Sequence, residues 1–372
     1  MITIYKSFQE IDFTHVKNRE TVEAFLRTIM DGLHGKIVNI HCDVYAVLIN
    51  DYLYPMTITT KNYHDSWIVS PYGQYVISLR EEIEHHISSS FMRKIMYMGT
   101  DFLSFCLRQV ENRVVYVHNF LVSTNLYSEQ CPIDIKMLTE ELTKAFPQHA
   151  IAFRSLNKRT AADWMEKLAG NHYQPFGSRV IYYWHPQEKL KKNERTDHKK
   201  DRKLLEKSAY VIEKGLNEDE ASEMVQLYNL LYLDKYSKNN PQYTASFIYH
   251  LSQTDLFHFI TLKDQKFVAF AGYFIMNEQM AAPFFGWDTR ISERNGIYRM
   301  ISHVLYQAGT EHQILMNHSG GAGGYKKMRG CKPEMEYTYM YTKHLRPKGR
   351  FFWSILRFFT HTIGGKLLWK YR

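Results

Sequence analysis

The chain has 372 residues, of which 45% are hydrophobic, 15% are aromatic and 23% are charged, and its formal net charge is +9. This length and apolar content suffice for one large or two medium folded domains and exclude a largely disordered chain. A basic balance favours an anionic partner, such as a nucleic acid, a phosphorylated cofactor or an anionic membrane, without choosing among them.

The cysteine pattern and the start of the chain point to a reducing compartment. The four cysteines are scattered and form no CxxC pair, which argues against a zinc site and a disulfide scaffold. Residues 41–43 have metal-ligand types but no partners at metal spacing, so no metal site is predicted. The first residues carry acids and no apolar run, so we expect no signal peptide. No apolar stretch is long enough to span a bilayer, and we expect a cytoplasmic protein.

The first half of the chain, up to about residue 190, alternates predicted strands and helices. Apolar residues recur at strand or helix spacing in each segment. The predicted strands cover 44–49, 113–123, 150–155 and 178–184. The predicted helices cover 90–110, 133–146 and 160–170.

A run of charged residues over 189–207 follows, with nine bases and four acids. Such a run is typical of a solvated linker and helix face, and the alternative is a patch that contacts phosphate. It is the best candidate for a domain boundary.

The second half repeats the pattern of the first. The predicted helices cover 217–236, 246–254 and 295–312. The predicted strands cover 257–263, 266–276, 280–290, 313–319 and 335–344. A polar pair at 264–265 predicts a hairpin turn between the first two of these strands. Both halves run strand, loop, helix, strand, which predicts a structural duplication.

The stretch HSGGAGGYKKMRG, residues 318–330, is rich in glycine and leads into bases. It is not a Walker A loop, because Tyr325 and Lys327 stand where that motif needs Gly and Ser or Thr. The Rossmann pattern G-x-G-x-x-G fails as well. What remains is a flexible turn between a strand and a short basic helix, where bare N–H groups favour anions.

The order of these elements, with GGYKKMRGCKPEMEYTYMY following NGIYRMISHVLYQAG, resembles the FemAB-like and BioF2-like acyltransferases, which carry two GNAT domains in tandem. The resemblance covers residues 195–345 by sequence and 1–190 by element order. It implies an α/β (α+β) fold of two GNAT-like domains, 1–190 and 191–347, each a mixed, mostly antiparallel sheet flanked by helices. A basic, aromatic, amphipathic tail follows at 348–372.

The resemblance implies an enzyme, an N-acyltransferase that moves an acyl group from a thioester to an amine. No cofactor is tightly bound, and acyl-CoA or an acyl-carrier protein is the co-substrate. The chain departs from acetyl-CoA enzymes at their pyrophosphate loop. Aligned on Gly296, it has Glu293 in place of Gln or Arg, and Tyr298 in place of a small residue. FemAB-like proteins share that loss and use aminoacyl-tRNA donors, so aminoacyl transfer stays open, as does a non-catalytic binding protein.

Acyl transfer to an amine needs a proton acceptor, donors for the oxyanion and an acid for the leaving group. Asp288, at the end of a predicted strand, and His318, after the next strand, are the candidate bases. Tyr325 is the candidate acid or ligand donor. The alternative roles are a turn cap, a structural histidine and a packing aromatic.

Other residues are assigned to ligand contacts. By the resemblance, Lys326 stands where family members place a lysine that binds substrate phosphate. The residues predicted to bind the co-substrate are Asn295, Gly296, Tyr298, Gly323, Gly324, Lys326, Lys327 and Arg329. The residues predicted to line a substrate cleft are Asn119, Ser123, Asn125, Tyr273 and Trp287, and turn capping is the alternative for the first three.

The C-terminal stretch, residues 350–372, combines apolar side chains at helical spacing with basic flanks. This pattern favours an interfacial helix on an anionic membrane, which would place the protein at the inner membrane face. A lid over an acyl tunnel and a helix packed on the domain surface are the alternatives.

Overall fold

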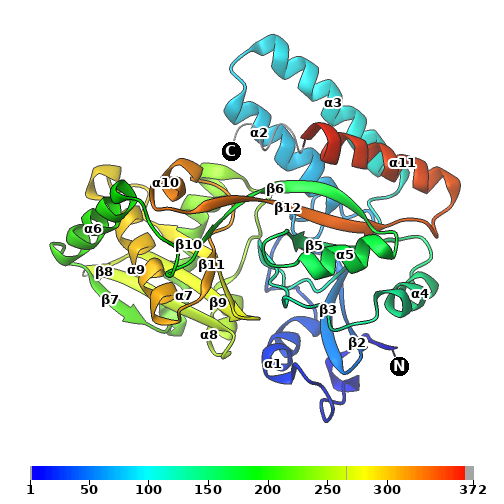
Figure 1. Ribbon diagram of the computed structural model, residues 1–372, viewed down its shortest axis with the longest axis horizontal. Coiled ribbons are helices and arrows are strands. Elements are labelled where there is room, and N and C mark those ends of the chain that lie inside the picture. Colours follow the sequence, from blue (N-terminus) through cyan, green and yellow to red (C-terminus); the bar gives the residue numbers. More distant parts are fainter. Residues whose placement is uncertain (1, 265, 365–372) are drawn as a thin grey trace. The chain divides into compact units, whose positions relative to one another are not determined.

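The structure is a computed structural model that describes residues 2–264 and 266–364. The chain forms two compact units (Figure 1). Of the described residues, unit 1 contains 2–178, 237–241 and 336–364, and unit 2 contains 179–236, 242–264 and 266–335. The predicted domain limits, 1–190, 191–347 and 348–372, remain a prediction.

Unit 1 is built on a mixed sheet with helices around it. Its strands lie in the order β1-β2-β3-β4-β5-β12, and only β4 and β5 are parallel to each other. The strands are β1 (Ile2–Tyr5), β2 (Asp43–Ile49), β3 (Tyr52–Thr59), β4 (Val114–Val117), β5 (Ala150–Leu156) and β12 (Lys332–Tyr341). The helices are η1 (Phe8–Glu10), α1 (Arg19–Met30), η2 (Gly73–Ile77), α2 (Ser78–His86), α3 (Ser90–Gln109), α4 (Ile135–Ala145), α5 (Ala162–Gly170), α11 (Pro347–Arg357) and η5 (Phe358–Gly364).

Unit 2 repeats this plan. Its strands lie in the order β7-β8-β9-β10-β11-β6, and only β10 and β11 are parallel. The strands are β6 (Gln174–Trp184), β7 (Val211–Lys214), β8 (Phe257–Asp264), β9 (Lys266–Met276), β10 (Gln279–Trp287) and β11 (Leu315–Asn317). The helices are α6 (Lys192–Glu206), α7 (Glu218–Tyr228), η3 (Asn229–Tyr236), α8 (Ala245–Ser252), η4 (Glu293–Asn295), α9 (Ile297–Glu311) and α10 (Gly323–Met328).

The matching strand orders confirm the predicted duplication and the predicted fold class. In each unit, the first four strands of the sheet are antiparallel to their neighbours, the fourth pairs in parallel with the fifth, and a sixth, antiparallel strand closes the sheet. The final strand of each sheet comes from the other half of the chain. Strand β6 follows α5 of unit 1 but pairs with β11, and β12 follows α10 of unit 2 but pairs with β5.

Each unit has its own apolar core on the faces of its sheet. In unit 1, Val115 and Phe153 of the parallel pair pack with Trp164 of α5. In unit 2, Met300 and Ile301 of α9 pack with Met280 of β10. Strands covered on both faces read as nearly continuous apolar runs, which is why β4 and β5 were recognisable in the sequence.

Most predicted elements are confirmed, and two predicted strands are shorter than expected. The strand predicted at 113–123 ends at Val117, because His118 and Leu121 have left-handed φ angles of 59° and 56°. The strand predicted at 313–319 covers only Leu315–Asn317. The predicted turn pair 264–265 joins β8 and β9, although residue 265 lies outside the described residues. Residues 365–372 of the predicted tail lie outside them too.

Candidate functional site

The parallel pair of unit 2 separates partway along its length. β10 pairs with β11 only from Gln279–Ala281 to Leu315–Asn317. β10 then continues to Trp287 alongside β9, with a register shift between Ala281 and Phe284. From residue 282 onward, the edge of β10 that faces β11 therefore has no strand partner among the described residues. Ligands of open α/β sheets bind at such carboxyl ends of strands, where the backbone offers N–H and C=O groups.

The turn after β10 leads into the N-terminus of α9. Ser292 Oγ accepts a hydrogen bond from the Arg294 N–H at 3.4 Å, and Gly296 takes a left-handed φ of 70°. A Cβ on Gly296 would lie 2.4 Å from Leu204 Cδ2. Gly296 supplies no side-chain cap for α9, so the first-turn N–H groups and the helix dipole favour an anion there.

Glu293 and Tyr298, the two departures from the acetyl-CoA pattern, both have partners within unit 2. The Glu293 carboxylate lies 3.3 Å from the Lys235 ammonium and is highly exposed. The Tyr298 ring packs on Phe285 and Tyr325, with centroid distances of 5.6 and 4.7 Å. Burial raises the pKa of Tyr298, which keeps its hydroxyl protonated. The expectation that these two side chains obstruct a pyrophosphate stays a prediction.

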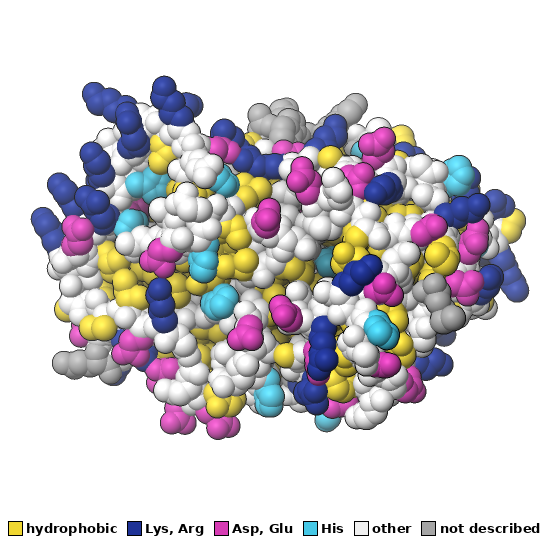
Figure 2. All heavy atoms as spheres, turned by 60° about the horizontal axis from the view of Figure 1, so that its bottom comes forward, with side chains coloured by type: hydrophobic (Ala, Val, Ile, Leu, Met, Phe, Trp, Pro, Cys, Tyr) yellow, Lys and Arg dark blue, Asp and Glu magenta, His cyan; other side chains and the backbone are white. Residues whose placement is uncertain are grey.

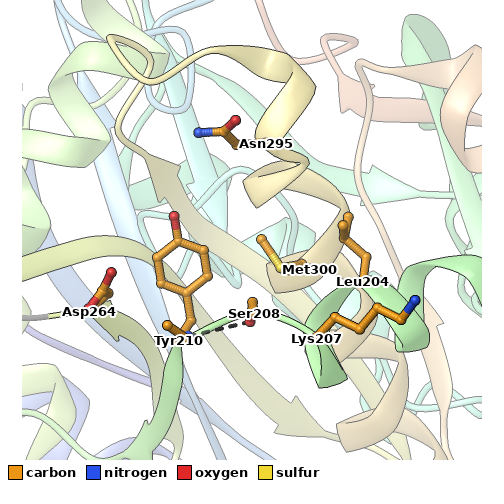
Figure 3. A pocket seen from close by; sticks show the side chains of 8 residues that line it. Leu204, Lys207, Ser208, Tyr210, Asp264, Asn295 and Met300 are labelled. Atoms are coloured by element: carbon orange, nitrogen blue, oxygen red, sulfur yellow. Dashed lines mark hydrogen bonds between the residues drawn. The ribbon is translucent and has the colours of Figure 1, made fainter.

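A shallow hollow of about 330 Å³ lies beside the first turn of α9 (Figure 3). Asn295 and Met300 border it on the α9 side, and Lys207, Tyr210 and Asp264 border it elsewhere. Ser208 Oγ accepts a hydrogen bond from the Tyr210 N–H at 3.3 Å, which shapes the chain after α6. The hollow combines a helix N-terminus with a lysine, a hydroxyl and an amide, which are groups that bind phosphate, and with the Asp264 carboxylate, which opposes an anion.

Asp288 follows β10, and Arg290 holds its carboxylate. Arg290 donates from Nε at 2.7 Å and from Nη2 at 2.8 Å, and its backbone N–H donates at 3.1 Å. These hydrogen bonds lower the pKa of Asp288. A carboxylate held in this way is a poor proton acceptor at neutral pH, and its contacts form a cap at the turn. Its predicted catalytic role stays untested.

The glycine stretch is a tight loop closed by Lys326. Gly321 and Ala322 have left-handed φ angles of 71° and 46°. The Lys326 ammonium donates to the carbonyl oxygens of His318 and Gly320, both at 2.6 Å, and of Ser319 at 3.3 Å. Burial lowers the pKa of Lys326 to about 7. All three donors of Lys326 point into the loop, so this lysine shapes the loop rather than reaching for a ligand.

The two neighbouring glycines and Lys327 differ in their surroundings. A Cβ on Gly323 would lie 2.2 Å from the Tyr182 hydroxyl, so a glycine is required there. A Cβ on Gly324 would meet nothing within 4 Å. Lys327 is exposed on the outer face of α10. Of the residues predicted around this loop, Gly324 and Lys327 are exposed.

A buried ion cluster lies under α10, centred on Asp201 of α6. Asp201 is 1% exposed, and it accepts hydrogen bonds from Arg329 Nε at 2.9 Å and Nη2 at 3.0 Å. Arg299 Nε of α9 donates to it at 2.7 Å, and the Tyr325 hydroxyl donates at 3.2 Å. Arg329 and Tyr325 are therefore tied to one carboxylate, and burial raises the pKa of Tyr325.

His318 follows β11 at the start of the glycine loop. Of the two predicted bases, it is the one whose ring nitrogen lacks a hydrogen-bond partner among the described residues. Its ring packs on Tyr306 with a centroid distance of 4.7 Å. Its Nε2 is buried and has no hydrogen-bond partner within the described part of the chain. Burial, with the neighbouring Lys326 ammonium, lowers the pKa of His318 to about 3. The imidazole is therefore neutral at physiological pH and can accept a hydrogen bond.

Two aromatic residues predicted for the cleft are buried in unit 2. Tyr273 is 6% exposed and its ring lies 5.2 Å from that of His258. Trp287 ends β10, and the Lys235 ammonium lies 5.6 Å above its ring. Trp287 is at the open edge of β10, whereas Tyr273 packs on the neighbouring strand β8.

The residues predicted in the first half belong to unit 1 and form a buried polar network. The Asn119 amide donates to Thr57 Oγ1 at 3.0 Å and accepts from Arg154 Nη1 at 3.1 Å. Asn125 Oδ1 accepts from the Phe120 N–H at 3.1 Å. Ser123 lies in the same segment and is partly buried. These contacts fix the chain after β4, and the predicted role of Asn119, Ser123 and Asn125 in lining a substrate cleft stays a prediction.

Asp201 was not among the predicted site residues. It lies in the charged run 189–207, which is typical of a solvated linker and helix face. Six Lys and Arg side chains of α6 surround it in sequence, and Figure 2 shows dark blue side chains gathered at the left margin, the side where α6 lies in Figure 1. An aspartate is the only residue of α6 that is fully buried. Helical spacing alone gives no signal for one acid that turns inward. Within the described residues, no group of three His, Cys, Asp or Glu side chains could hold a metal ion.

The chain is similar in fold to solved structures of low sequence identity. FemX matches with a TM-score of 0.49 over 92% of this chain and 97% of that chain, at 8% identity. A tandem GNAT protein from the clavulanic acid biosynthesis pathway matches with 0.41 over 92% and 98%, at 6% identity. L-PGS from Bacillus licheniformis matches with 0.45 over 59% and 77%, at 12% identity.

One of these structures, the protein from the clavulanic acid pathway, is a tandem GNAT protein. No protein-family model matches the chain, and no curated protein matches it in sequence. The likeness to the solved structures carries no activity or site residue over to this chain.

Proposed function

We propose that unit 2 transfers an acyl group from a thioester, on CoA or on a carrier protein, to an amine. The observation that carries this proposal is the separation of β10 from β11 after Ala281 and Asn317. Among the described residues, this separation leaves one edge of β10 without a strand partner, near the N-terminus of α9. A thioester donor has an amide-containing arm that can pair with a strand edge and phosphates that suit a helix N-terminus.

The reaction needs no covalent intermediate on the protein. The amine nitrogen attacks the thioester carbonyl carbon, and the resulting oxyanion collapses with loss of the thiolate. The nitrogen gives up one proton and the thiolate takes up one, so an amide and a thiol result. N–H groups on the open edge of β10 are suited to hold the oxyanion. We assign the neutral His318 imidazole to accept a hydrogen bond from the attacking amine.

The hollow beside α9 is the proposed place for the phosphates of the donor. Lys207 and the first-turn N–H groups of α9 supply positive charge there. The Lys326 clamp and the Asp201 cluster are assigned to positioning, because their donors are already used within the protein. Unit 1 has no assigned chemistry.

A second candidate function is aminoacyl transfer from charged tRNA, and the bases of α6 favour it. α6 has six bases and four acids, and one acid, Asp201, is turned inward. A basic helix face of this kind can contact a phosphate backbone. The transfer chemistry at β10 would be the same, with an ester donor in place of a thioester.

Thermal unfolding against a set of donors separates these candidates. The set contains CoA, acetyl-CoA, longer acyl-CoA, acylated and free carrier protein, and charged and uncharged tRNA. A ligand at a hundred times its Kd adds about 2.7 kcal/mol to the free energy of unfolding, which a melting curve resolves. An acylated donor that raises the midpoint more than its unacylated form supports thioester transfer. A shift with charged tRNA alone supports the second candidate, and no shift with any donor overturns both.

The site is tested by a histidine pair. His318→Gln keeps a polar side chain but removes the imidazole, and we expect the rate of amide formation to fall about 100-fold. His312→Gln is the matched control, because His312 is exposed at the end of α9. Equal rates for the two variants would remove His318 from the reaction.

A further inference from the structure

Helix α3 of unit 1 exposes a continuous stripe of large apolar side chains. The positions advance by four, three, four and three residues, so they share one face of the helix. They are Phe91, Ile95, Met98, Phe102 and Phe105, which are 41–73% exposed. Met92, 47% exposed, lies next to this stripe. A soluble helix normally carries polar residues on such a face.

The opposite side of α3 is packed, so the exposed stripe is not the core face of the helix. Leu103 and Leu107 are buried in a cluster with Trp353 and Leu356 of α11. Helix α11 lies beside α3 (Figure 1). The exposed stripe is a second apolar face that the described residues of unit 1 leave uncovered.

Helix α11 and η5 extend the apolar surface. The Phe105 and Phe352 rings lie 5.8 Å apart, and so do the Phe102 and Phe359 rings. Phe351 and Phe358, seven residues apart, are 59% and 54% exposed. Among the described residues, fourteen large apolar side chains are exposed, and eight of them lie in α3, α11 and η5. We call these eight side chains the α3–α11 face.

The charges around the α3–α11 face are mostly positive. Helix α3 has Arg93, Lys94 and Arg108, and its one acid, Asp101, pairs with Arg80 of α2. Helix α11 has three bases and no acid, and the sequence contains no Asp or Glu after Glu336. The acids of neighbouring α2 are Glu81, Glu82 and Glu84, of which Glu81 accepts a hydrogen bond from Ser237 and Glu84 from Tyr97.

We propose that the α3–α11 face docks unit 1 on the surface of an anionic lipid bilayer. Phenylalanine, methionine and isoleucine side chains would enter the boundary between headgroups and acyl chains, and the flanking bases would meet the lipid phosphates. A second copy of the chain is a poorer occupant, because it would bring the same bases against these bases. Within the described residues no helix is long and apolar enough to cross a bilayer, so the contact is at the surface.

Vesicle flotation of the full chain tests this docking, independently of any transfer activity. Wild-type protein should float with vesicles that contain phosphatidylglycerol. Its partition coefficient should be at least about 100-fold lower on phosphatidylcholine alone. The triple variant Phe91→Ser, Met98→Ser, Phe351→Ser should lose about 100-fold or more on the anionic vesicles. Val211→Ser with Ile212→Ser, two exposed apolar positions of β7 in unit 2, is the matched control and should float like wild type.

The controls keep the result open to contradiction. All three altered side chains are at least 59% exposed, so the melting temperature should stay within a few degrees of wild type. If the triple variant does not fold, the three single variants are floated instead. The proposal would be overturned if wild-type protein did not float with anionic vesicles, or if the variants floated as well as wild type. A concentration-dependent dimer that the same substitutions abolish, with no flotation, would assign the face to a second copy.

Discussion

Asp201 holds three segments of unit 2 together, so its removal should be among the most damaging single changes in that unit. Asp201 lies on α6, Arg299 on α9, and Tyr325 and Arg329 at α10. The carboxylate receives hydrogen bonds from all three partners. Asp201→Ala would leave the Arg329 guanidinium, which is 5% exposed, without its buried counter-charge.

The magnitude follows from burial. Removing one partner of a buried ion pair typically lowers the free energy of unfolding by about 3–5 kcal/mol, because the other charge stays desolvated. Arg299 is more exposed and can regain water, so the loss should come mainly from Arg329. We therefore expect Asp201→Ala to lower the free energy of unfolding by about 4 kcal/mol. Asp201→Ala combined with Arg329→Met should recover part of that loss, since no buried charge is then left alone.

Urea denaturation of the variants measures this difference. Asp197→Ala is the matched control, because Asp197 lies one turn earlier on α6 and pairs with Lys200 at the surface, at 3.1 Å. An exposed pair contributes about 0–1 kcal/mol, so the control should be nearly neutral. If Asp201→Ala is no more harmful than Asp197→Ala, the ion cluster does not organise this part of unit 2.

Three further outcomes follow from the same geometry. Lys326→Met keeps the aliphatic stem but leaves the carbonyls of the glycine loop without their donor. Urea denaturation should show that the free energy of unfolding falls by about 2 kcal/mol. Lys327→Met, a change at an exposed position of the same helix, is the control and should have little effect. Gly296→Ala places a Cβ at a left-handed φ and against Leu204, so we expect the free energy of unfolding to fall by about 1–2 kcal/mol. Leu204→Ala in the same chain should relieve the clash but not the backbone strain. An unchanged urea midpoint for Gly296→Ala would refute the strain. Burial lowers the pKa of His118 and His149 to about 4 and that of His318 to about 3, so the unfolded state binds more protons between pH 6.5 and these values. The free energy of unfolding should therefore fall with acidification in that window, by up to about 1.4 kcal/mol per pH unit for each histidine, and a flat profile between pH 6.5 and 5 would contradict this.

The order of many helices and strands could be predicted because it depends on local patterns, but strands β1, β3 and β7 and helix α1 were not predicted. Strand β10, helix α9 and strand β11 follow from apolar spacing, and the glycine loop follows from its composition. The short strand β4 was overestimated, because a β-rich sequence does not reveal that His118 and Leu121 turn left-handed. The exchange of β6 and β12 between the units could not be predicted, since pairing partners are set by tertiary contacts and not by the strands themselves.

The side-chain partners of the candidate site residues could not be predicted from the sequence. The sequence predicts Asp288, His318 and Tyr325 as site residues from their positions at strand and loop ends. In the structure, Asp288 accepts a hydrogen bond from Arg290, and Tyr325 donates one to Asp201. Lys326 reads as an anion-binding lysine in the sequence, whereas its ammonium closes on three backbone carbonyls. Side-chain partners depend on which segments meet in space, and a single sequence does not contain that information.

The most direct test of the proposed transfer follows the acyl carbonyl itself. Donors labelled with carbon-13 at that carbonyl, as acyl-CoA, acyl-carrier protein and aminoacyl-tRNA, are incubated with the protein and a mixture of small, peptide and lipid amines, and products are read by mass spectrometry. We predict label in an amide with wild-type protein and about 100-fold less with His318→Gln. Donors that stay intact, or that release labelled free acid without any amide, would contradict acyl transfer by this chain.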